Sequence, residues 1–459
     1  MTHAPNSPEA RDVAHHLHGY TNAVRHEEIG PLVIDRGEGI YVHDIHGKRY
    51  IEAMAGLWSV GVGFSEPRLV EAATKQMRQL PFYHTFGHKS QGPVIDLAGE
   101  LISLAPVPMS KVFFTNSGSE ANDTVMKLLR YRANAMGEPK RKKFISRIRA
   151  YHGVTLASAS LTGLPANHRS FDLPIDGVLH TSSPHFWREG RPGETEEAFA
   201  TRCAEDLEAM ILAEGPETIC AMFGEPVMGA GGVVVPPATY WEKIQAVLQK
   251  YGILLVADEV ICGFGRTGNF WGSQTYGMKP NVLTCSKQLS SSYLPISALM
   301  IDESVYRPIA EESGRIGTLG HGFTAGGHPV AAAVALENIA IIRERGLVDN
   351  ARVVGAHMQK RLRELSGHPL VGEVRGVGLV AAVELVVDKA AKTALDPVGK
   401  LGGMVANFLQ EEGVISRAMG ESIAFCPPMI ITEAQVDDMV GTFAKALDRA
   451  AASLDLLVG

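Results

Sequence analysis

The chain has 459 residues, of which 45% are hydrophobic and 20% charged, a composition typical of a globular protein with about two or three domains. Its net charge of −7 argues against nucleic acid or an anionic membrane surface as a partner. No apolar stretch approaches the ~18 residues of a membrane span, and the polar start MTHAPNSPEARD lacks the profile of a signal peptide.

Histidines gather near the N-terminus in the run HHLHGYT, from His15 to Thr21. Adjacent histidines more often cap or pack than bind metal, and the sequence shows no carboxylate or cysteine cluster beside them. His84 and His88 have helical spacing, but a glycine lies between them and the acid of a helical zinc motif is missing. We therefore expect no metal. The 5 scattered cysteines show no pairing pattern, which favours reduced thiols and a cytoplasmic protein.

The first elements predict a hairpin and a loop. Segments around residues 39–53 resemble two strands that turn at 45–47. The glycine-rich stretch AGLWSVGVGF, residues 55–64, follows and contains Trp58. Such a loop allows the backbone to approach a ligand, so Trp58 either walls a pocket or packs in the core. The sequence does not favour one of these interpretations over the other.

Strands and helices alternate from residue 67 onward. We expect helices over 67–80, 92–105, 121–137 and 239–252, and strands at 111–114, 217–227, 253–257 and 282–285. This alternation predicts an α/β fold with a mostly parallel sheet covered by helices on both faces. Ligands bind such sheets at the carboxyl ends of the strands, so polar residues at those ends are candidates for a site.

The turn NSGSE connects one strand to a helix and places small residues at the helix N-terminus. Free amides and the positive end of the helix dipole favour an anion such as phosphate there. The simpler interpretation is a helix cap made by Ser117 or Ser119, with Glu120 in the first turn. Farther on, Tyr151 follows a strand; it could stack on a flat cofactor, although a packed tyrosine is the more common case.

Asp258 and Lys287 each follow a buried apolar run. A lysine in such a place is costly to desolvate unless it has a use. A Schiff-base lysine holding pyridoxal phosphate (PLP), with an aspartate paired to the pyridinium nitrogen, explains both residues. Taken singly, a surface lysine and a capping aspartate would be the simpler interpretation. Together with the anion-binding turn, the PLP interpretation is the stronger one.

The segment GFGRTG, residues 263–268, matches the dinucleotide fingerprint G-x-G-x-x-G. That fingerprint requires a helix to open at the third glycine, but the turn-like NFWGSQTYG follows. We therefore reject a dinucleotide site. Beyond residue 330, helices mix with antiparallel strands, which predicts a smaller α+β domain. We expect residues 1–55 to join this small domain, residues 56–329 to form the large domain, and residues 330–459 to form the rest of the small one.

Six motifs occur in the order seen in class III aminotransferases, and the chain resembles that family over nearly its whole length. They are NSGSEAN, AYHG, GEPVMGAGG, ADEVICGFGRTG, SKQLSSSYLPIS and GFTAGGHP. These enzymes are PLP-dependent and have fold type I, with a large sheet domain and a smaller α+β domain. The chain looks most similar to the amine or ω-amino acid:pyruvate transaminases. The resemblance implies transfer of an amino group from an amine to a keto acid, with pyruvate as the expected acceptor, in a homodimer with shared active sites.

The resemblance also implies roles for individual residues. Lys287 and Asp258 match the catalytic lysine and the partner of the ring nitrogen. The other residues matching cofactor contacts are Gly118, Ser119, Tyr151, Glu225, Val260 and, from the neighbouring subunit, Thr324. Arg417 matches the residue that accepts a substrate carboxylate. The remaining substrate-pocket residues would be Trp58, Phe86, Tyr151, Ala230 and, with least support, Tyr20.

The chain departs from the family pattern at two positions. In the ornithine and γ-aminobutyrate branches, a second glutamate lies five residues after the one that matches Glu225, and it neutralises the active-site arginine. In this chain that position is Ala230. The missing carboxylate disfavours those two substrates as the main ones. Gln288 follows the lysine where many relatives have glycine, and the sequence offers no physical reason for it. A decarboxylase or aminomutase on the same fold is the alternative activity, since fold does not fix reaction. A nucleotide-binding oxidoreductase or a non-catalytic α/β protein is the other class, which the context of GFGRTG disfavours.

Overall fold

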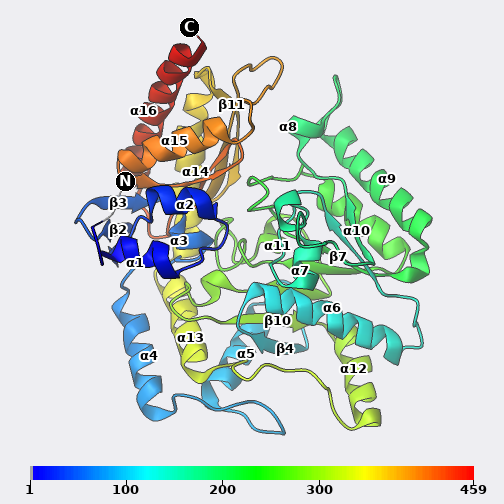
Figure 1. Ribbon diagram of the computed structural model, residues 1–459. Coiled ribbons are helices and arrows are strands. Elements are labelled where there is room, and N and C mark those ends of the chain that lie inside the picture. The colour runs from blue at the N-terminus through cyan, green and yellow to red at the C-terminus, as the bar shows by residue number, and fades with distance from the viewer. Residues whose placement is uncertain (1–3, 459) are drawn as a thin grey trace.

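The computed structural model describes residues 4–458 and is built around a seven-stranded sheet (Figure 1). The strand order is β4-β10-β9-β8-β7-β5-β6, and only β10 runs antiparallel to its neighbours. The strands are β4 (Lys111–Thr115), β5 (Lys143–Arg147), β6 (Val178–Thr181), β7 (Ile219–Gly224), β8 (Leu254–Asp258), β9 (Val282–Cys285) and β10 (Ser297–Ile301). The expected mostly parallel α/β sheet is confirmed.

Helices cover both faces of this sheet, because side chains of a strand alternate between the faces. On β5, Phe144 packs into one core cluster with α6 (Gly118–Ala135) and α12 (Glu303–Ile316). Its neighbour Ile145 packs into another with α9 (Glu196–Glu214) and α10 (Tyr240–Lys250). The central strands β7, β9 and β10 are buried at every residue, which explains their mostly apolar sequence.

Two smaller sheets complete the fold. One has the order β1-β2-β3-β13 and joins the two ends of the chain, because β13 (Val414–Ile415) pairs with β3 (Arg49–Glu52). Its other strands are β1 (Ile34–Glu38) and β2 (Tyr41–Asp44), and β2 and β3 form the expected hairpin. The second sheet has the order β11-β12-β15-β14, with strands β11 (Val371–Val377), β12 (Val380–Leu385), β15 (Ser422–Phe425) and β14 (Arg417–Met419). In Figure 1 the blue N-terminal segment accordingly lies beside the orange C-terminal elements.

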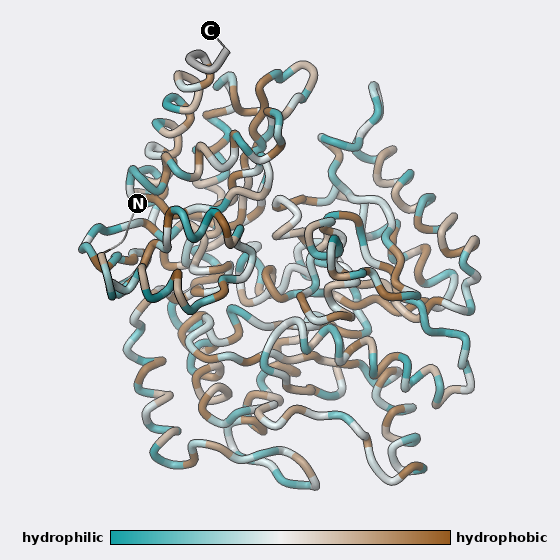
Figure 2. The backbone as a smooth tube through the Cα atoms, viewed as in Figure 1, coloured by the Kyte–Doolittle hydropathy of each residue, from teal (hydrophilic) through white to brown (hydrophobic). Residues whose placement is uncertain are grey.

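Further helices lie outside the central sheet, two of them at the predicted ranges 67–80 and 92–105. They include α1 (Pro8–His15), α2 (Ala23–Ile29), α4 (Pro67–Gln79), α5 (Gly92–Leu104), α13 (Pro329–Glu344), α14 (Leu347–Arg363), α15 (Lys400–Glu411) and α16 (Glu433–Val458). Hydrophilic and hydrophobic residues alternate along outer helices such as α4 and α9 (Figure 2). None of the helices in the described part of the chain is long and apolar enough to cross a membrane.

The helix α13 packs against α4 and α5 as well as against α14. It therefore belongs to the core that both predicted domains share, and a domain boundary at residue 330 stays a prediction.

Candidate functional site

A cavity of about 170 Å³ lies at the carboxyl ends of four neighbouring strands, β5, β7, β8 and β9. It brings together seven of the residues expected at the site: Gly118, Ser119, Tyr151, Glu225, Asp258, Val260 and Lys287. His152, Gly153, Val227, Ile261 and Ser286 complete its lining. Because parallel strands end at one edge of a sheet, residues more than a hundred positions apart in sequence meet here.

Asp258 is the last residue of β8, and its carboxylate lies in a network of buried hydrogen bonds. Asn122 Nδ2 and His152 Nδ1 both donate to Asp258 Oδ2 at 2.8 Å. The backbone amide of Val260 donates to the other oxygen at 3.1 Å. Three donors hold the carboxylate in one orientation.

Lys287 follows β9 and has a left-handed backbone, with φ 48°. A positive φ is strained for a residue with a side chain, and such strain is found preferentially at functional sites. Burial lowers the pKa of Lys287, while the nearby carboxylates of Asp258 and Glu225 oppose that change. A lysine with a lowered pKa has more of the neutral amine that acts as a nucleophile or a base.

The start of α6 closes one end of the cavity. Ser117 is the N-cap and accepts from the amide of Glu120, which leaves Gly118 and Ser119 facing the cavity. A Cβ atom added to Gly118 would lie 3.1 Å from Val260 Cγ2. One added to Gly153 would lie 2.6 Å from Ser119 Oγ. Two glycines thus leave the space beside the amides of an 18-residue helix, where an anion is stabilised.

Glu225 is buried in the wall of the cavity and connects two backbone segments by hydrogen bonds. Its two carboxylate oxygens accept from the backbone amides of Tyr151 and Gly229, each at 3.0 Å. Burial raises the pKa of Glu225. Burial also raises the pKa of Tyr151, with smaller contributions from Tyr20 and Asp258. The Tyr151 side chain is therefore a neutral phenol on the cavity wall.

Three expected substrate residues lie near the cavity but do not line it. Trp58 is 1% exposed and packs with Val227 and Ile261, which do line it. Its packing is that of a core residue directly behind the cavity wall. Ala230 lies partly buried in the loop after β7.

Arg417 begins β14 and is partly buried. Its charge adds slightly to the burial that lowers the pKa of Lys287, and it slightly opposes the burial that raises the pKa of Tyr151. Among the described residues, its guanidinium has no hydrogen bond and no carboxylate partner. A buried or partly buried cation without a counter-charge is costly, so this position suits an anionic ligand.

Phe86 and Thr324 are not brought to the cavity within one chain. Thr324 is exposed in the loop between α12 and α13. The same loop contacts Phe86, since a Cβ atom on Gly322 would lie 2.6 Å from its ring. Phe86 is 47% exposed. Both residues are therefore exposed, and neither lines the cavity that contains Lys287.

The structure adds residues that the sequence did not assign. Asn122 and His152 hold Asp258, although Asn122 had been interpreted only as part of a helix. A polar residue on the buried face of that helix was the available signal, because buried amides need partners.

The structure also accounts for Gln288, which follows the lysine. Its amide is fully buried, donates to the carbonyl of Gly263 at 3.0 Å and accepts from Arg266 at 3.1 Å. Arg266 donates in turn to the carbonyls of Leu379 and Pro427. Gln288 thus connects the lysine loop to the GFGRTG loop and, through Arg266, to the C-terminal part of the chain.

Comparison with known proteins gives consistent matches. Residues 21–447 match the profile of the family described as "Aminotransferase class-III". The curated "Gamma aminobutyrate transaminase 1, mitochondrial" of Solanum lycopersicum is 49% identical over 429 residues, or 93% of this chain and 83% of that protein. A transaminase solved with L-alanine is 72% identical, with a TM-score of 0.92 over 92% of this chain and 100% of its own. The omega transaminase of Pseudomonas jessenii in complex with PMP is 59% identical, with a TM-score of 0.97 over 97% of this chain and 99% of its own.

Proposed function

This chain belongs to the class III aminotransferases, which depend on PLP, and we propose that it transfers an amino group from an amine or ω-amino acid to pyruvate by a ping-pong mechanism. The observation that carries the proposal is the cavity that combines Lys287, Asp258 and the N-terminus of α6. A lysine of lowered pKa, an oriented carboxylate and an anion cradle are the three features a PLP site requires.

The residues of the cavity fit PLP. Gly118 and Ser119 would hold its phosphate, because their glycine-lined cradle lies at a helix N-terminus. Asp258 would pair with the ring nitrogen, and Tyr151 and Val260 would contact the ring. Glu225 would act indirectly, by holding the backbone of Tyr151 in place. Bound PLP would supply the carbonyl group that receives the amino group and a ring that withdraws electrons from the substrate carbon.

Lys287 is proposed to anchor the cofactor and then to move the proton of the substrate carbon. Its lowered pKa suits both tasks, because both need the neutral amine. Asp258 is proposed to keep its charge beside the ring nitrogen. His152 and Asn122 support this role, since they hold its carboxylate by hydrogen bonds.

Substrate recognition is proposed to depend on Arg417. Pyruvate has a carboxylate, and a guanidinium pairs with a carboxylate through two parallel hydrogen bonds. Ala230 provides no competing counter-charge, so the guanidinium stays available. The transaminase relative solved with L-alanine supports this acceptor, because L-alanine is what pyruvate becomes when it receives an amino group. Trp58 and Phe86 are proposed to shape the pocket for the amine donor.

The function is tested by assaying a panel of amine donors with pyruvate. The measured product is the alanine formed. The panel should include a diamine, β-alanine, taurine, an aryl amine and γ-aminobutyrate. The last of these is included because curated relatives are named for it, whereas Ala230 disfavours it as the main donor. We expect alanine to form in proportion to donor consumed. Consumption of the amine without consumption of a keto acid would instead indicate a decarboxylase or an aminomutase.

Two further features belong to the proposal. We propose a homodimer in which Thr324 and Phe86 reach the cavity of the other subunit, because both are exposed and neither lines the cavity of its own chain. We also propose that the enzyme works in the cytoplasm. The five free, buried cysteines support a reducing compartment, although the curated tomato relative is named as mitochondrial.

A further inference from the structure

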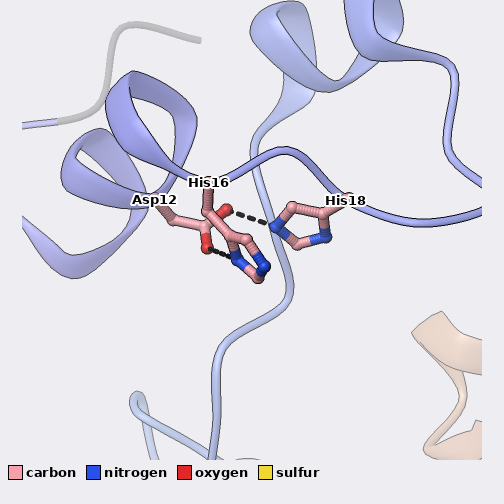
Figure 3. A group of neighbouring side chains, drawn as sticks. All are labelled: Asp12, His16 and His18. Carbon is pink, nitrogen blue, oxygen red and sulfur yellow. Dashed lines mark hydrogen bonds and ion pairs between the residues drawn. The ribbon is translucent and has the colours of Figure 1, made fainter.

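Histidines from the N-terminal segment surround one carboxylate, well separated in sequence from the residues of the catalytic cavity (Figure 3). His16 Nδ1 lies 3.0 Å from Asp12 Oδ1, and His18 Nε2 lies 2.7 Å from Asp12 Oδ2. His26 Nε2 contacts the same Oδ2 atom at 3.0 Å. One ligand atom from each of Asp12, His16 and His18 lies within 4.8 Å of the other two. A cavity of about 270 Å³ borders the group.

Local backbone geometry explains this arrangement. Asp12 and His16 are four residues apart at the end of α1, so they lie on one face of the helix. The backbone becomes extended at His16, which returns His18 to the same side and points Leu17 away, 85% exposed. The sequence had shown no carboxylate cluster beside the histidines; the fold supplies Asp12, and α2 adds His26.

Hydrogen bonds alone do not explain why three histidines gather around the Asp12 carboxylate. Three imidazoles share two carboxylate oxygens, and their rings are 4.3 Å (His16–His18) and 4.2 Å (His18–His26) apart. The Asp12 side chain is 22% exposed and offers two oxygens to three ring nitrogens, so surface contacts of this kind contribute little on their own.

We propose that Asp12, His16 and His18 bind a divalent transition-metal ion of the zinc type, with His26 holding the Asp12 carboxylate in place. Imidazole and carboxylate are usual zinc ligands, and an open fourth position would take water. Zinc bonds of 2.0–2.2 Å separate tetrahedral ligand atoms by about 3.3–3.6 Å. The 3.0 and 2.7 Å contacts of His16 and His18 with the two oxygens of Asp12 would therefore open as the ion enters between the three side chains. A hydrogen-bonded carboxylate ligand is the usual outer-shell arrangement.

A second group of potential ligands, His185, Glu373 and Glu384, provides a contrast. Arg375 contacts both of its carboxylates, and Arg188 also pairs with Glu384. Guanidinium cations thus already occupy the place a metal would take. No arginine or lysine pairs with Asp12 among the described residues.

The metal site would control one residue at the catalytic cavity. Tyr20 lies in sequence between His18 and His26, and its ring centroid is 6.5 Å from that of Tyr151. Its hydroxyl accepts from Asn167 Nδ2 at 2.5 Å, and its backbone is left-handed, with φ 51°. A metal ion that joins the end of α1 to the following segment would fix the loop that carries Tyr20. The ion is thus a structural clamp next to the substrate pocket, without a part in the chemistry.

Zinc content of the holoenzyme tests the site directly. The enzyme is purified without a polyhistidine tag, treated with chelator, given Zn²⁺ and separated from free ion by gel filtration before elemental analysis. We expect about one zinc ion per chain in the wild type, and less than about a tenth of that in the H16Q/H18Q double variant. The matched control is H15Q, because His15 is an exposed neighbour outside the group, and it should retain the wild-type content. H26Q should weaken binding by about 10–100-fold.

Equal zinc content in the wild type and the double variant, whether high or low, overturns the proposal. Visible absorbance of bound PLP and circular dichroism show whether the double variant is folded. Should it not fold, Co²⁺ added to the wild type gives an independent result. Tetrahedral cobalt bands that Zn²⁺ abolishes and excess PLP leaves unchanged support the site, and their absence overturns it.

Hydrogen exchange tests the clamp. Zn²⁺ should slow amide exchange in peptides covering residues 12–26 of the wild type by about tenfold and leave H16Q/H18Q unchanged. The control peptide is α9, which is distant in sequence from the site. Zinc that binds without slowing exchange in residues 12–26 would overturn the role assigned to the ion at Tyr20.

Discussion

His152 Nδ1 lies 2.8 Å from Asp258 Oδ2, and both side chains are buried at the end of the central sheet. This contact holds the carboxylate that we propose as the partner of the cofactor nitrogen. Replacing Asp258 by asparagine keeps the shape and removes the charge. We expect Asp258→Asn to retain PLP and to slow the amine half-reaction by on the order of 10²-fold or more, as measured by stopped-flow absorbance.

Glu259→Gln is the matched control for that experiment. Glu259 is the adjacent buried acid, but it accepts from Ser273 and Gly272 and does not line the cavity. Burial raises the pKa of Glu259 to about 7, and Glu259→Gln removes a buried carboxyl group beside Asp258 without changing the lining of the cavity. Half-reaction rates that are unchanged in Asp258→Asn would assign the role to another residue.

Lys287→Ala should abolish the covalent link to the cofactor. Borohydride reduction followed by mass spectrometry should find the cofactor fixed to the wild type and not to the variant. Turnover should fall by about 10²–10⁴-fold or more, because the variant also loses its proton-transfer group. Lys279→Ala, at an exposed lysine, serves as the control. A variant that still forms a reducible adduct contradicts the assignment of Lys287.

Arg417→Ala should slow the half-reaction with pyruvate much more than the half-reaction with an amine that lacks a carboxylate. A charged hydrogen bond contributes about 1.5–3 kcal/mol, so the efficiency with which the enzyme uses pyruvate in its half-reaction should fall by about 10–100-fold. The half-reaction with an amine that lacks a carboxylate should change far less, because we expect the guanidinium to swing away from such a substrate. Single-turnover absorbance measures each half separately. Equal losses in both would show that Arg417 is structural.

Glu52 should make stability depend on pH. Burial raises its pKa to about 8, although hydrogen bonds from the amides of Gly56 and Met54 oppose the change. The folded state therefore binds one more proton than the unfolded state between about pH 4.5 and 8. Its contribution to stability is complete below that window and is lost as pH rises through 8.

Glu52→Gln removes this dependence, since glutamine cannot ionise. We expect the variant to gain stability relative to the wild type as pH rises from 5 to 8.5, by on the order of 1 kcal/mol or more. Urea unfolding at several pH values measures the difference. A constant difference across the range would mean that Glu52 is already ionised at neutral pH in the folded protein.

The proposed dimer should be visible in sedimentation. The wild type should sediment as a dimer at micromolar concentration, and Thr324→Ala should retain the dimer while binding PLP about tenfold more weakly, because one phosphate contact is lost. Val398→Ala, at another exposed position, is the control. A fully active monomer would refute the arrangement.

Sequence periodicity predicted the central sheet well, because buried parallel strands are continuous apolar runs such as 282–285. It also placed Asp258 and Lys287, since polar residues at the ends of such strands are conspicuous. The partners were harder to predict. Asn122 and His152 meet Asp258 only through folding, and no local pattern specifies a contact across 106 or 136 residues.

The lack of a local sequence pattern also explains why the roles of Gln288 and Asp12 could not be predicted. Gln288 depends on the buried guanidinium of Arg266, whose partners come from the C-terminal part of the chain. The sequence gives Asp12 no distinct role, and only the turn after α1 brings three imidazoles to it. Phe86 and Thr324 match the family by sequence, but only the fold shows that neither lines the cavity of its own chain.

All five cysteines are buried, and burial raises the pKa of Cys203, Cys220 and Cys426 to about 11. The thiolate is the form that reacts with maleimides and related reagents, so the native enzyme should resist labelling while folded. A cysteine introduced at Leu17, which is 85% exposed, would then be the single reactive thiol. A fluorophore attached there would report on the N-terminal segment in the otherwise unmodified enzyme.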